Sequence, residues 1–179
     1  MGIGGFFMSK ITQRIAYTAI LTAISVVLNM GTFNAGIKHF ALSFVYIPCF
    51  IAGYKLKLFD AFLVGFLGDL IAGIIHPLGP YLPLIGIGSG LLGLIPALVF
   101  KFSPFGKIAN TILSFFLVLV LVTAGINTFA LWLAFSKGAT FFAYLGARAP
   151  FQSLVLALNT IIALLLLPSI DRVIKTKLN

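Results

Sequence analysis

The sequence has almost no acidic residues. It contains three aspartates, Asp60, Asp69 and Asp171, and no glutamate, against 12 Lys and Arg, so its formal net charge is +9. Chemistry that needs two carboxylates inside a membrane is therefore not expected, because only Asp69 lies deep within an apolar run. The chain also has a single cysteine, Cys49, which excludes an internal disulfide.

The motifs of common enzyme classes are missing as well. The sequence has no Cys-x-x-Cys, no His-Glu-x-x-His and no Gly-x-Ser-x-Gly. Gly106-Lys107 is followed by Ile108 and lacks the upstream glycine of an ATPase phosphate loop. The two histidines are far from any cluster of metal ligands. We therefore expect no catalytic residue, no metal and no cofactor in this chain.

Apolar residues dominate what is present. Hydrophobic residues make up 61% of the chain and charged residues 8%, and the mean hydropathy is +1.18. Too few polar residues remain to cover a soluble surface, and a membrane span needs about 20 apolar residues. The sequence therefore predicts an all-α membrane protein with six transmembrane helices, at residues 12–30, 40–54, 58–75, 82–100, 108–135 and 149–169.

The chain shows no internal repeat and no soluble segment, so we expect one transmembrane domain over residues 1–179. Met8 is an alternative start, which would make residues 1–7 an extension. Nine Lys and Arg lie at the span ends, in the short loops and in the terminal segments on the side of the two termini, and three, Lys38, Lys137 and Arg148, lie on the other side. Cytoplasmic loops collect positive charge, which places both termini in the cytoplasm. The excess charge is thus explained by topology and anionic lipid, and no nucleic-acid partner is expected.

The stretch from Gly65 to Gly93 carries the most unusual polar residue. Asp69 lies in the middle of an apolar run, where a charged side chain costs about 2.5–3.5 kcal/mol, and therefore calls for a partner or a function. His76 follows two helical turns later on the same face. One interpretation is that both line an outward cavity. The alternatives are a structural hydrogen bond for Asp69 and a loop position for His76.

The first span has two faces that do not suit lipid. One is a polar stripe at helical spacing, formed by Thr18, Thr22, Ser25 and Asn29. The other is a face of small residues, Ala16, Ala19 and Ala23. Small residues four apart let a second helix approach closely, so this face is a candidate partner interface. Packing within the same protein is the alternative.

Polar residues also gather in the outer halves of the last two spans. Asn127 lies in the fifth span, Arg148 opens the sixth, and Gln152 and Asn159 follow on nearly one face. Amides and a guanidinium suit a carboxylate or amide-bearing solute. The alternative is that Arg148 extends to lipid headgroups while the amides join helices. The candidate ligand-binding residues are Asn29, Lys38, Phe40, Phe44, Asp69, His76, Tyr81, Asn127, Arg148 and Gln152.

With these residues the chain resembles the substrate-binding S components of energy-coupling factor (ECF) vitamin importers, in the folate, pantothenate and hydroxymethylpyrimidine group. The resemblance rests on three stretches: Ala19-x-x-x-Ala23; Gly65-x-x-Gly68-Asp69 continuing to His76-Pro77-x-Gly79-Pro80-Tyr81; and Asn127-Thr128 with Ala147-Arg148. It implies a bacterial plasma-membrane protein that binds a water-soluble vitamin in an outer pocket, closed by the loops after spans one and three.

The resemblance also implies the partners. The small-residue face of span one would dock on a membrane coupling subunit driven by two ATPase subunits, which use the ATP. The resemblance implies that folate binders of this group have an Arg near the outer end of span one. This chain has Leu28-Asn29-Met30 there. Pantothenate or hydroxymethylpyrimidine is therefore expected ahead of folate. A small membrane enzyme or channel that uses Asp69 is the alternative function.

Overall fold

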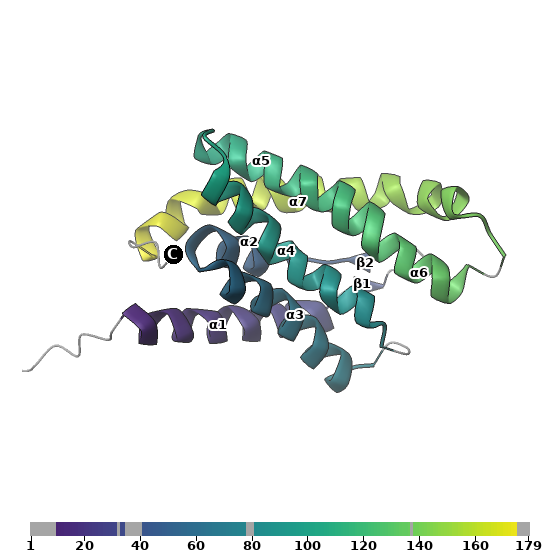
Figure 1. Ribbon diagram of the computed structural model, residues 1–179, viewed down its shortest axis with the longest axis horizontal. Helices are drawn as coiled ribbons and strands as arrows, with labels where there is room; N and C mark the ends of the chain where they lie inside the picture. The colour runs from purple at the N-terminus through teal and green to yellow at the C-terminus, as the bar shows by residue number, and fades with distance from the viewer. Residues whose placement is uncertain (1–9, 32, 35–40, 78–80, 137, 175–179) are drawn as a thin grey trace, which may run out of the picture.

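The described residues form a bundle of helices with one short pair of strands. The computed structural model describes residues 10–31, 33–34, 41–77, 81–136 and 138–174. In chain order its elements are α1 (Lys10–Met30), β1 (Phe33–Asn34), β2 (Ala41–Leu42), α2 (Tyr46–Lys55), α3 (Leu58–Ile75), α4 (Pro83–Phe102), α5 (Lys107–Leu117), the π-helix η1 (Val118–Asn127), α6 (Thr128–Phe135) and α7 (Phe141–Val173). The start of α1 and the end of α7 lie at the same end of the bundle (Figure 1).

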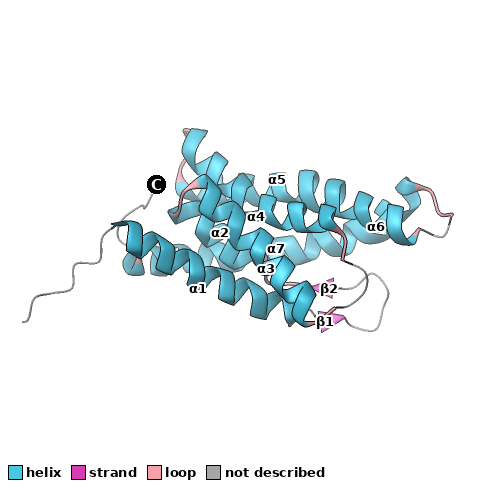
Figure 2. Ribbon diagram, turned by 60° about the horizontal axis from the view of Figure 1, so that its bottom comes forward, coloured by secondary structure: helices cyan, strands magenta, loops and turns pink. Residues whose placement is uncertain are grey.

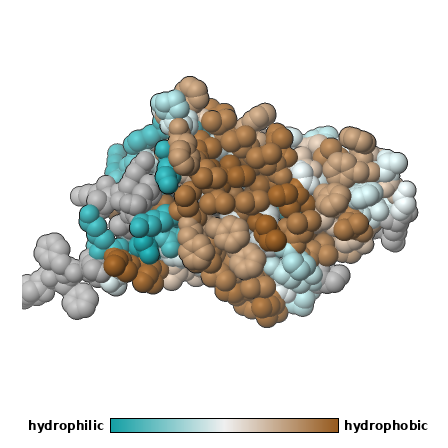
Figure 3. Space-filling model, in the orientation of Figure 1, coloured by the Kyte–Doolittle hydropathy of each residue, from teal (hydrophilic) through white to brown (hydrophobic). Residues whose placement is uncertain are grey.

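We call the end with these two helix termini the terminal end, and the opposite end, where α1 finishes and α7 begins, the distal end. The antiparallel strands β1 and β2 lie at the distal end (Figure 2). Hydrophilic residues gather at the terminal end, and an apolar band covers the middle of the molecule (Figure 3). This distribution is what a bilayer-spanning protein requires, because hydrocarbon contacts only the middle of each helix.

Five helices are long and apolar enough to cross a bilayer, counting α5, η1 and α6 as one continuous helix over Lys107–Phe135 within the described part of the chain. The predicted span at 40–54 differs from the structure, because α2 begins only at Tyr46 and has 10 residues. At 1.5 Å per residue it is about 15 Å long, about half the hydrocarbon thickness. A sixth crossing that includes α2 therefore stays a prediction.

The last helix is longer than expected. Residues 136–147 were predicted as an outer connection, but α7 already begins at Phe141 and continues through Pro150 and Pro168. The Thr140 side chain caps its first turn by accepting a hydrogen bond from Ala143 N at 3.4 Å. Arg148 consequently lies two turns inside α7 rather than at its first residue.

Helix α2 forms the centre of the bundle. It packs against α1, α3, α4 and α7, and eight of its 10 residues are buried. Around it, α1 lies on α3, α3 on α4, and α4 on the helix formed by α5 and η1. Cys49 and Phe50 of α2 are 0% and 1% exposed. The short helix is therefore enclosed by protein rather than by lipid.

Glycines set the close contact of α3 with its neighbours. A Cβ at Gly65 would collide with the main-chain carbonyl of Ser89 on α4, and one at Gly93 would collide with the carbonyl of Ala61. A Cβ at Gly68 would collide with the Ser25 hydroxyl of α1. The glycines of the Gly65-x-x-Gly68 motif thus serve helix packing, as small residues do in membrane bundles.

Ion pairs hold the terminal half together. Lys55 Nζ at the end of α2 lies 2.6 Å from Asp171 Oδ1 on α7, and Lys107 Nζ at the start of α5 lies 2.6 Å from Asp171 Oδ2. The Tyr54 hydroxyl donates to the same carboxylate at 2.8 Å. On the other side of the bundle, Arg14 Nε of α1 lies 3.0 Å from Asp60 Oδ2 of α3.

Candidate functional site

A small cavity lies between η1, α6 and α7 and brings two of the predicted ligand residues together. Its volume is about 230 Å³. Arg148 and Gln152 line it from α7, one turn apart, and Gln152 is buried. The remaining lining residues are Leu119, Val120, Thr123, Ala124, Thr128, Leu145, Ala149 and Ser153. The cavity is therefore apolar with a few polar groups, which is the usual character of a small-molecule site.

The Arg148 guanidinium is a cation that no acidic side chain of the protein pairs with. The chain has only three acidic side chains, and all three lie in the described residues. Asp60 and Asp171 are in ion pairs with other residues, and Asp69 accepts a hydrogen bond from Asn29. The Nε of Arg148 is buried without a hydrogen-bond partner among the described residues. A partly buried cation without an anion is costly, so this position favours an acidic occupant.

The aromatic ring of Tyr144 lies beside the guanidinium of Arg148, with 5.9 Å from Cζ to the ring centroid. Tyr144 is one turn before Arg148 on the same face of α7. A cation over a ring is attracted by its π face, which helps to hold the guanidinium in place.

The π-helix decides which residues of the fifth span reach the cavity. Thr123 and Thr128 both line it, and the Thr128 hydroxyl donates to the Thr123 carbonyl at 2.7 Å. A π-helix bonds over five residues rather than four, so residues five apart share a face. Asn127 does not line this cavity, and its Oδ1 lies against Gly88 of α4, where a Cβ would collide with it.

Thr123 was not among the sequence candidates, and Thr128 was noted only as the neighbour of Asn127. Periodicity could not have found them, because the usual analysis assumes 3.6 residues per turn. A single sequence carries no signal for a π register in a run such as VLVLVTAGIN. The Thr123 hydroxyl also lies 3.5 Å from the Tyr46 hydroxyl of α2, which connects this wall of the cavity to the centre of the bundle.

A second polar group lies where α1, α3 and the segment before α4 meet. Asn29 Nδ2 donates to Asp69 Oδ1 at 3.1 Å. The ring of Tyr81 lies against Gly73, and its hydroxyl lies against Gly86. Burial, followed by the charge and hydrogen bond of Asp69, raises the pKa of Tyr81. The Asp69 carboxylate thus joins α1 to α3, and contact of Asp69 with a solute stays a prediction.

The other candidates have varied environments. Phe44 is half-buried just before α2, and His76 is exposed at the end of α3. Lys38 and Phe40 lie outside the described residues. Asn159 is fully buried, and its Nδ2 donates to the carbonyl of Ser43 at 3.0 Å, so this amide joins α7 to the segment before α2. The structure does not place the Asp69 group in the cavity that contains Arg148.

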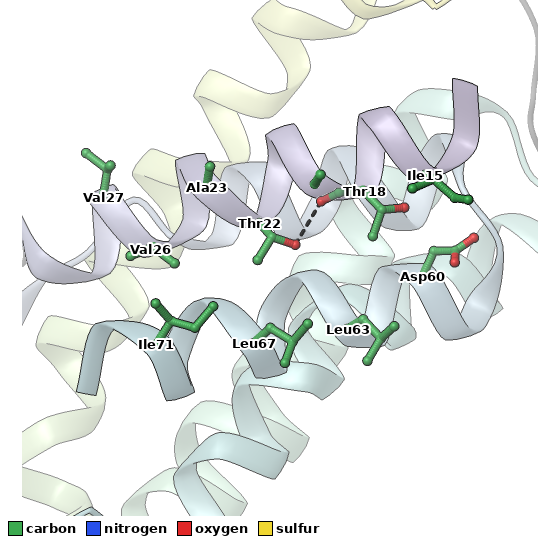
Figure 4. Close-up of a pocket in the computed structure, with 11 residues that line it drawn as sticks. Ile15, Thr18, Thr22, Ala23, Val26, Val27, Asp60, Leu63, Leu67 and Ile71 are labelled. Atoms are coloured by element: carbon green, nitrogen blue, oxygen red, sulfur yellow. Dashed lines mark hydrogen bonds between the residues drawn. The ribbon is translucent and has the colours of Figure 1, made fainter. Parts of the chain in front are cut away.

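A larger apolar groove lies between α1 and α3. Its volume is about 720 Å³, and it includes Ala19 and Ala23. In Figure 4 the side chains of Thr18 and Thr22 on α1 face those of Leu63 and Leu67 on α3 across the groove. The other lining residues are Ile15, Val26, Val27, Asp60 and Ile71. Ala16, the third residue of the predicted interface, is half-buried and does not line the groove.

The polar stripe of the first span is therefore divided in the structure. Ser25 is fully buried and Asn29 bonds Asp69, whereas Thr18 and Thr22 line the groove together with the alanines. Each threonine hydroxyl donates to a carbonyl four residues earlier in α1, at 2.9 and 2.8 Å. This bonding uses the single hydrogen of each hydroxyl within the helix, so the threonines offer the groove no donor, and the other side chains that line it, apart from Asp60, are apolar.

Comparison with known proteins identifies a family that the sequence matches and a solved structure with a similar fold. The family described as ECF transporter, substrate-specific component, matches residues 13–167. A search of curated protein sequences gives no match. Among solved structures, the chain is similar to a crystal structure of FolT bound with folic acid, with a TM-score of 0.72 and 23% identity over 87% of this chain and 92% of that chain. At this identity the similarity shows a shared fold.

Proposed function

The chain belongs to the family of ECF transporter substrate-specific components, and we propose that it captures a water-soluble vitamin or vitamin precursor at its distal end. On this proposal the whole chain is one transmembrane substrate-binding domain of a bacterial plasma membrane. Its termini lie in the cytoplasm, as the nine-to-three distribution of Lys and Arg favours. The distal end then faces the outside, where the solute is collected.

The observation that carries the proposal is the position of Arg148. It lies in a cavity with Gln152, and every aspartate of the chain is engaged elsewhere. A solute carboxylate would supply the missing anion through charge-assisted hydrogen bonds. We propose that Arg148 and Gln152 bind the acidic or amide end of the solute. The other candidate residues of the distal end would contact the rest of it.

For the solute itself we place pantothenate or hydroxymethylpyrimidine ahead of folate. The chain has Leu28-Asn29-Met30 near the outer end of span one, where the resemblance implies an arginine in folate binders, and the Asn29 amide donates to the Asp69 carboxylate. This corner of the distal end therefore has an anion and no cation of its own among the described residues, which disfavours the glutamate of a folate. The similar solved structure is described as FolT bound with folic acid. Its sequence is 23% identical to this chain.

The groove between α1 and α3 is the proposed docking surface for the transmembrane coupling subunit. It is apolar, and it contains Ala19 and Ala23, which are both exposed. Small residues let a partner helix approach closely in the membrane. The sequence has no ATPase phosphate loop, so on this proposal ATP is used by two partner subunits. A channel or enzyme that uses Asp69 is less favoured, because that carboxylate is hydrogen bonded between helices.

The test is to purify the protein and identify the bound solute by mass spectrometry. We then expect Arg148→Ala to weaken binding of an acidic vitamin by at least about tenfold, as loss of a charged hydrogen bond does. Arg172→Ala is the matched control, because Arg172 is exposed at the terminal end. Equal affinity in the two variants would remove Arg148 from the binding site. Turnover or ion flux by the isolated chain would overturn the proposal.

A further inference from the structure

Thr128, the first residue of α6 directly after the π-helix, has hydrogen-bonding capacity that no described residue uses. Thr128 is 1% exposed, and its hydroxyl hydrogen is given to the Thr123 carbonyl at 2.7 Å. A hydroxyl has one hydrogen to donate and two lone pairs that can accept. A group in the cavity that reaches this hydroxyl would therefore find only an acceptor. The π register is what places it on the cavity wall.

The α7 wall of the cavity supplies hydrogen-bond donors, from Arg148 and Gln152. The Arg148 guanidinium has only donors, and the Gln152 amide has both donors and an acceptor. An occupant that satisfies both walls must present an acceptor, best a carboxylate, to Arg148. It must also present an O–H or N–H group to Thr128. The two requirements together describe a molecule with an acid and a hydrogen-bond donor.

The dimensions of the cavity restrict the occupant further. Its volume is about 230 Å³, and a water molecule occupies about 30 Å³ of liquid, so there is room for about eight water volumes. The apolar lining, which includes Leu119, Ala124 and Leu145, suits a short aliphatic body between the two polar ends. A compact molecule fits, whereas a large fused-ring ligand would place only one end here.

Thr123 holds this wall in position. Its carbonyl fixes the Thr128 hydroxyl, and its own hydroxyl lies 3.5 Å from the Tyr46 hydroxyl of the enclosed helix α2. Thr123 is 2% exposed and Tyr46 is 8% exposed. Because α2 packs on four neighbouring helices, the threonine pair is fixed relative to the centre of the bundle.

We propose that Thr128, held at the start of α6 by Thr123 of the π-helix, determines specificity as a hydrogen-bond acceptor, and that the solute is a compact carboxylic acid with a hydroxyl or amide N–H. This inference rests on the proposed function and deepens it. It makes Arg148 the contact for the acid and Thr128 the contact for the donor. It therefore favours a pantothenate-like acid over the neutral hydroxymethylpyrimidine within the solutes considered above.

The test uses the full chain in nanodiscs of neutral lipid, with pantothenate, hydroxymethylpyrimidine and folate as the probes. Thr128→Val keeps the side-chain shape and removes the hydroxyl, and Thr128→Ser keeps the hydroxyl. We expect Thr128→Val to weaken pantothenate binding at least about tenfold and Thr128→Ser to restore most of it. Thr111→Val is the matched control, because the buried Thr111 hydroxyl bonds the Lys107 carbonyl of α5, outside the cavity.

The outcomes separate this inference from the proposed function. If pantothenate binds and Arg148→Ala abolishes binding while Thr128→Val does not change it, the inference is overturned and the proposed function stands. If none of the probes binds and no solute copurifies, the proposed function itself fails. Anionic lipid is a rival anion, because Val120 and Ser153 in the lining are exposed. Loss of pantothenate binding on adding anionic lipid, with no copurified solute, would overturn the inference in favour of a headgroup.

Discussion

Asn29 of α1 donates a hydrogen bond to Asp69 of α3 at 3.1 Å, and this bond fixes the distal end of the helix that also forms the groove wall. Because the acceptor is a carboxylate in a half-buried position, we expect Asn29→Ala to lower the free energy of unfolding by about 1–2 kcal/mol. The measurement is thermal unfolding in detergent. Met30→Ala, at the neighbouring exposed position, is the control. Equal midpoints for the two variants would contradict this prediction.

If the groove between α1 and α3 is the docking surface, substitutions in it should stop transport without affecting solute binding. Ala19→Trp and Ala23→Trp would fill the groove, so we expect both to abolish assembly with a coupling subunit and uptake while the solute affinity stays within about twofold of the unchanged protein. Ile20→Trp and Ile24→Trp are the controls, because these exposed α1 residues do not line the groove. If the alanine variants lose solute binding instead, that face serves internal packing.

The ionic cluster at the terminal end predicts unequal roles for its two lysines. Lys55 is 4% exposed, whereas the Lys107 side chain is 62% exposed, although both contact Asp171. We expect Lys55→Ala to cost about 2–4 kcal/mol of stability, because it removes a buried partner and leaves the Ile174 carbonyl without its donor. Lys107→Ala should cost below about 1 kcal/mol. Similar losses for the two variants, measured by chemical unfolding, would contradict this ranking.

The packing of α3 on α4 predicts a strong effect from one added methyl group. Gly65→Ala would place a Cβ on the main-chain carbonyl of Ser89, which cannot move without shifting α4. We expect a loss of about 1–3 kcal/mol, as for overpacked cores. Gly106→Ala is the control, since no atom of the described residues lies within 4 Å of the position that its added methyl group would take. A Gly65→Ala protein that unfolds at the same temperature as the control would show that the two helices can separate freely.

Sequence reasoning predicted the broad architecture because hydropathy and chain breakers act locally. The spans at 58–75 and 108–135 agree with α3 and with the helix from Lys107 to Phe135, to within one residue. Asp69 was recognised as needing a partner, and its bond to Asn29 supplies one. The predicted sixth span began at residue 149, whereas α7 begins at Phe141, because the segment before Arg148 is less apolar than the span and still forms helix.

The candidate site depended on information that a single sequence does not carry. The spacing of Arg148 and Gln152 was sufficient to place them on one face of a helix, and they share a cavity. In the structure Thr123 and Thr128 line the cavity, and the predicted Asn127 does not. This difference follows from the π-helical register of Val118–Asn127, which no residue of that segment indicates. The 10-residue length of α2 likewise follows from its tertiary packing, because the apolar run before it is long enough for more helix.

The enclosed position of α2 has a consequence for how the protein is made. A helix of 10 residues, about 15 Å long, is too short for the insertion machinery to treat as an independent crossing. Its terminal cation, Lys55, finds its anion on α7, which is synthesised more than 100 residues later. We therefore expect the packing around α2 to become complete only after α7 has been synthesised, because only then can Lys55 contact Asp171.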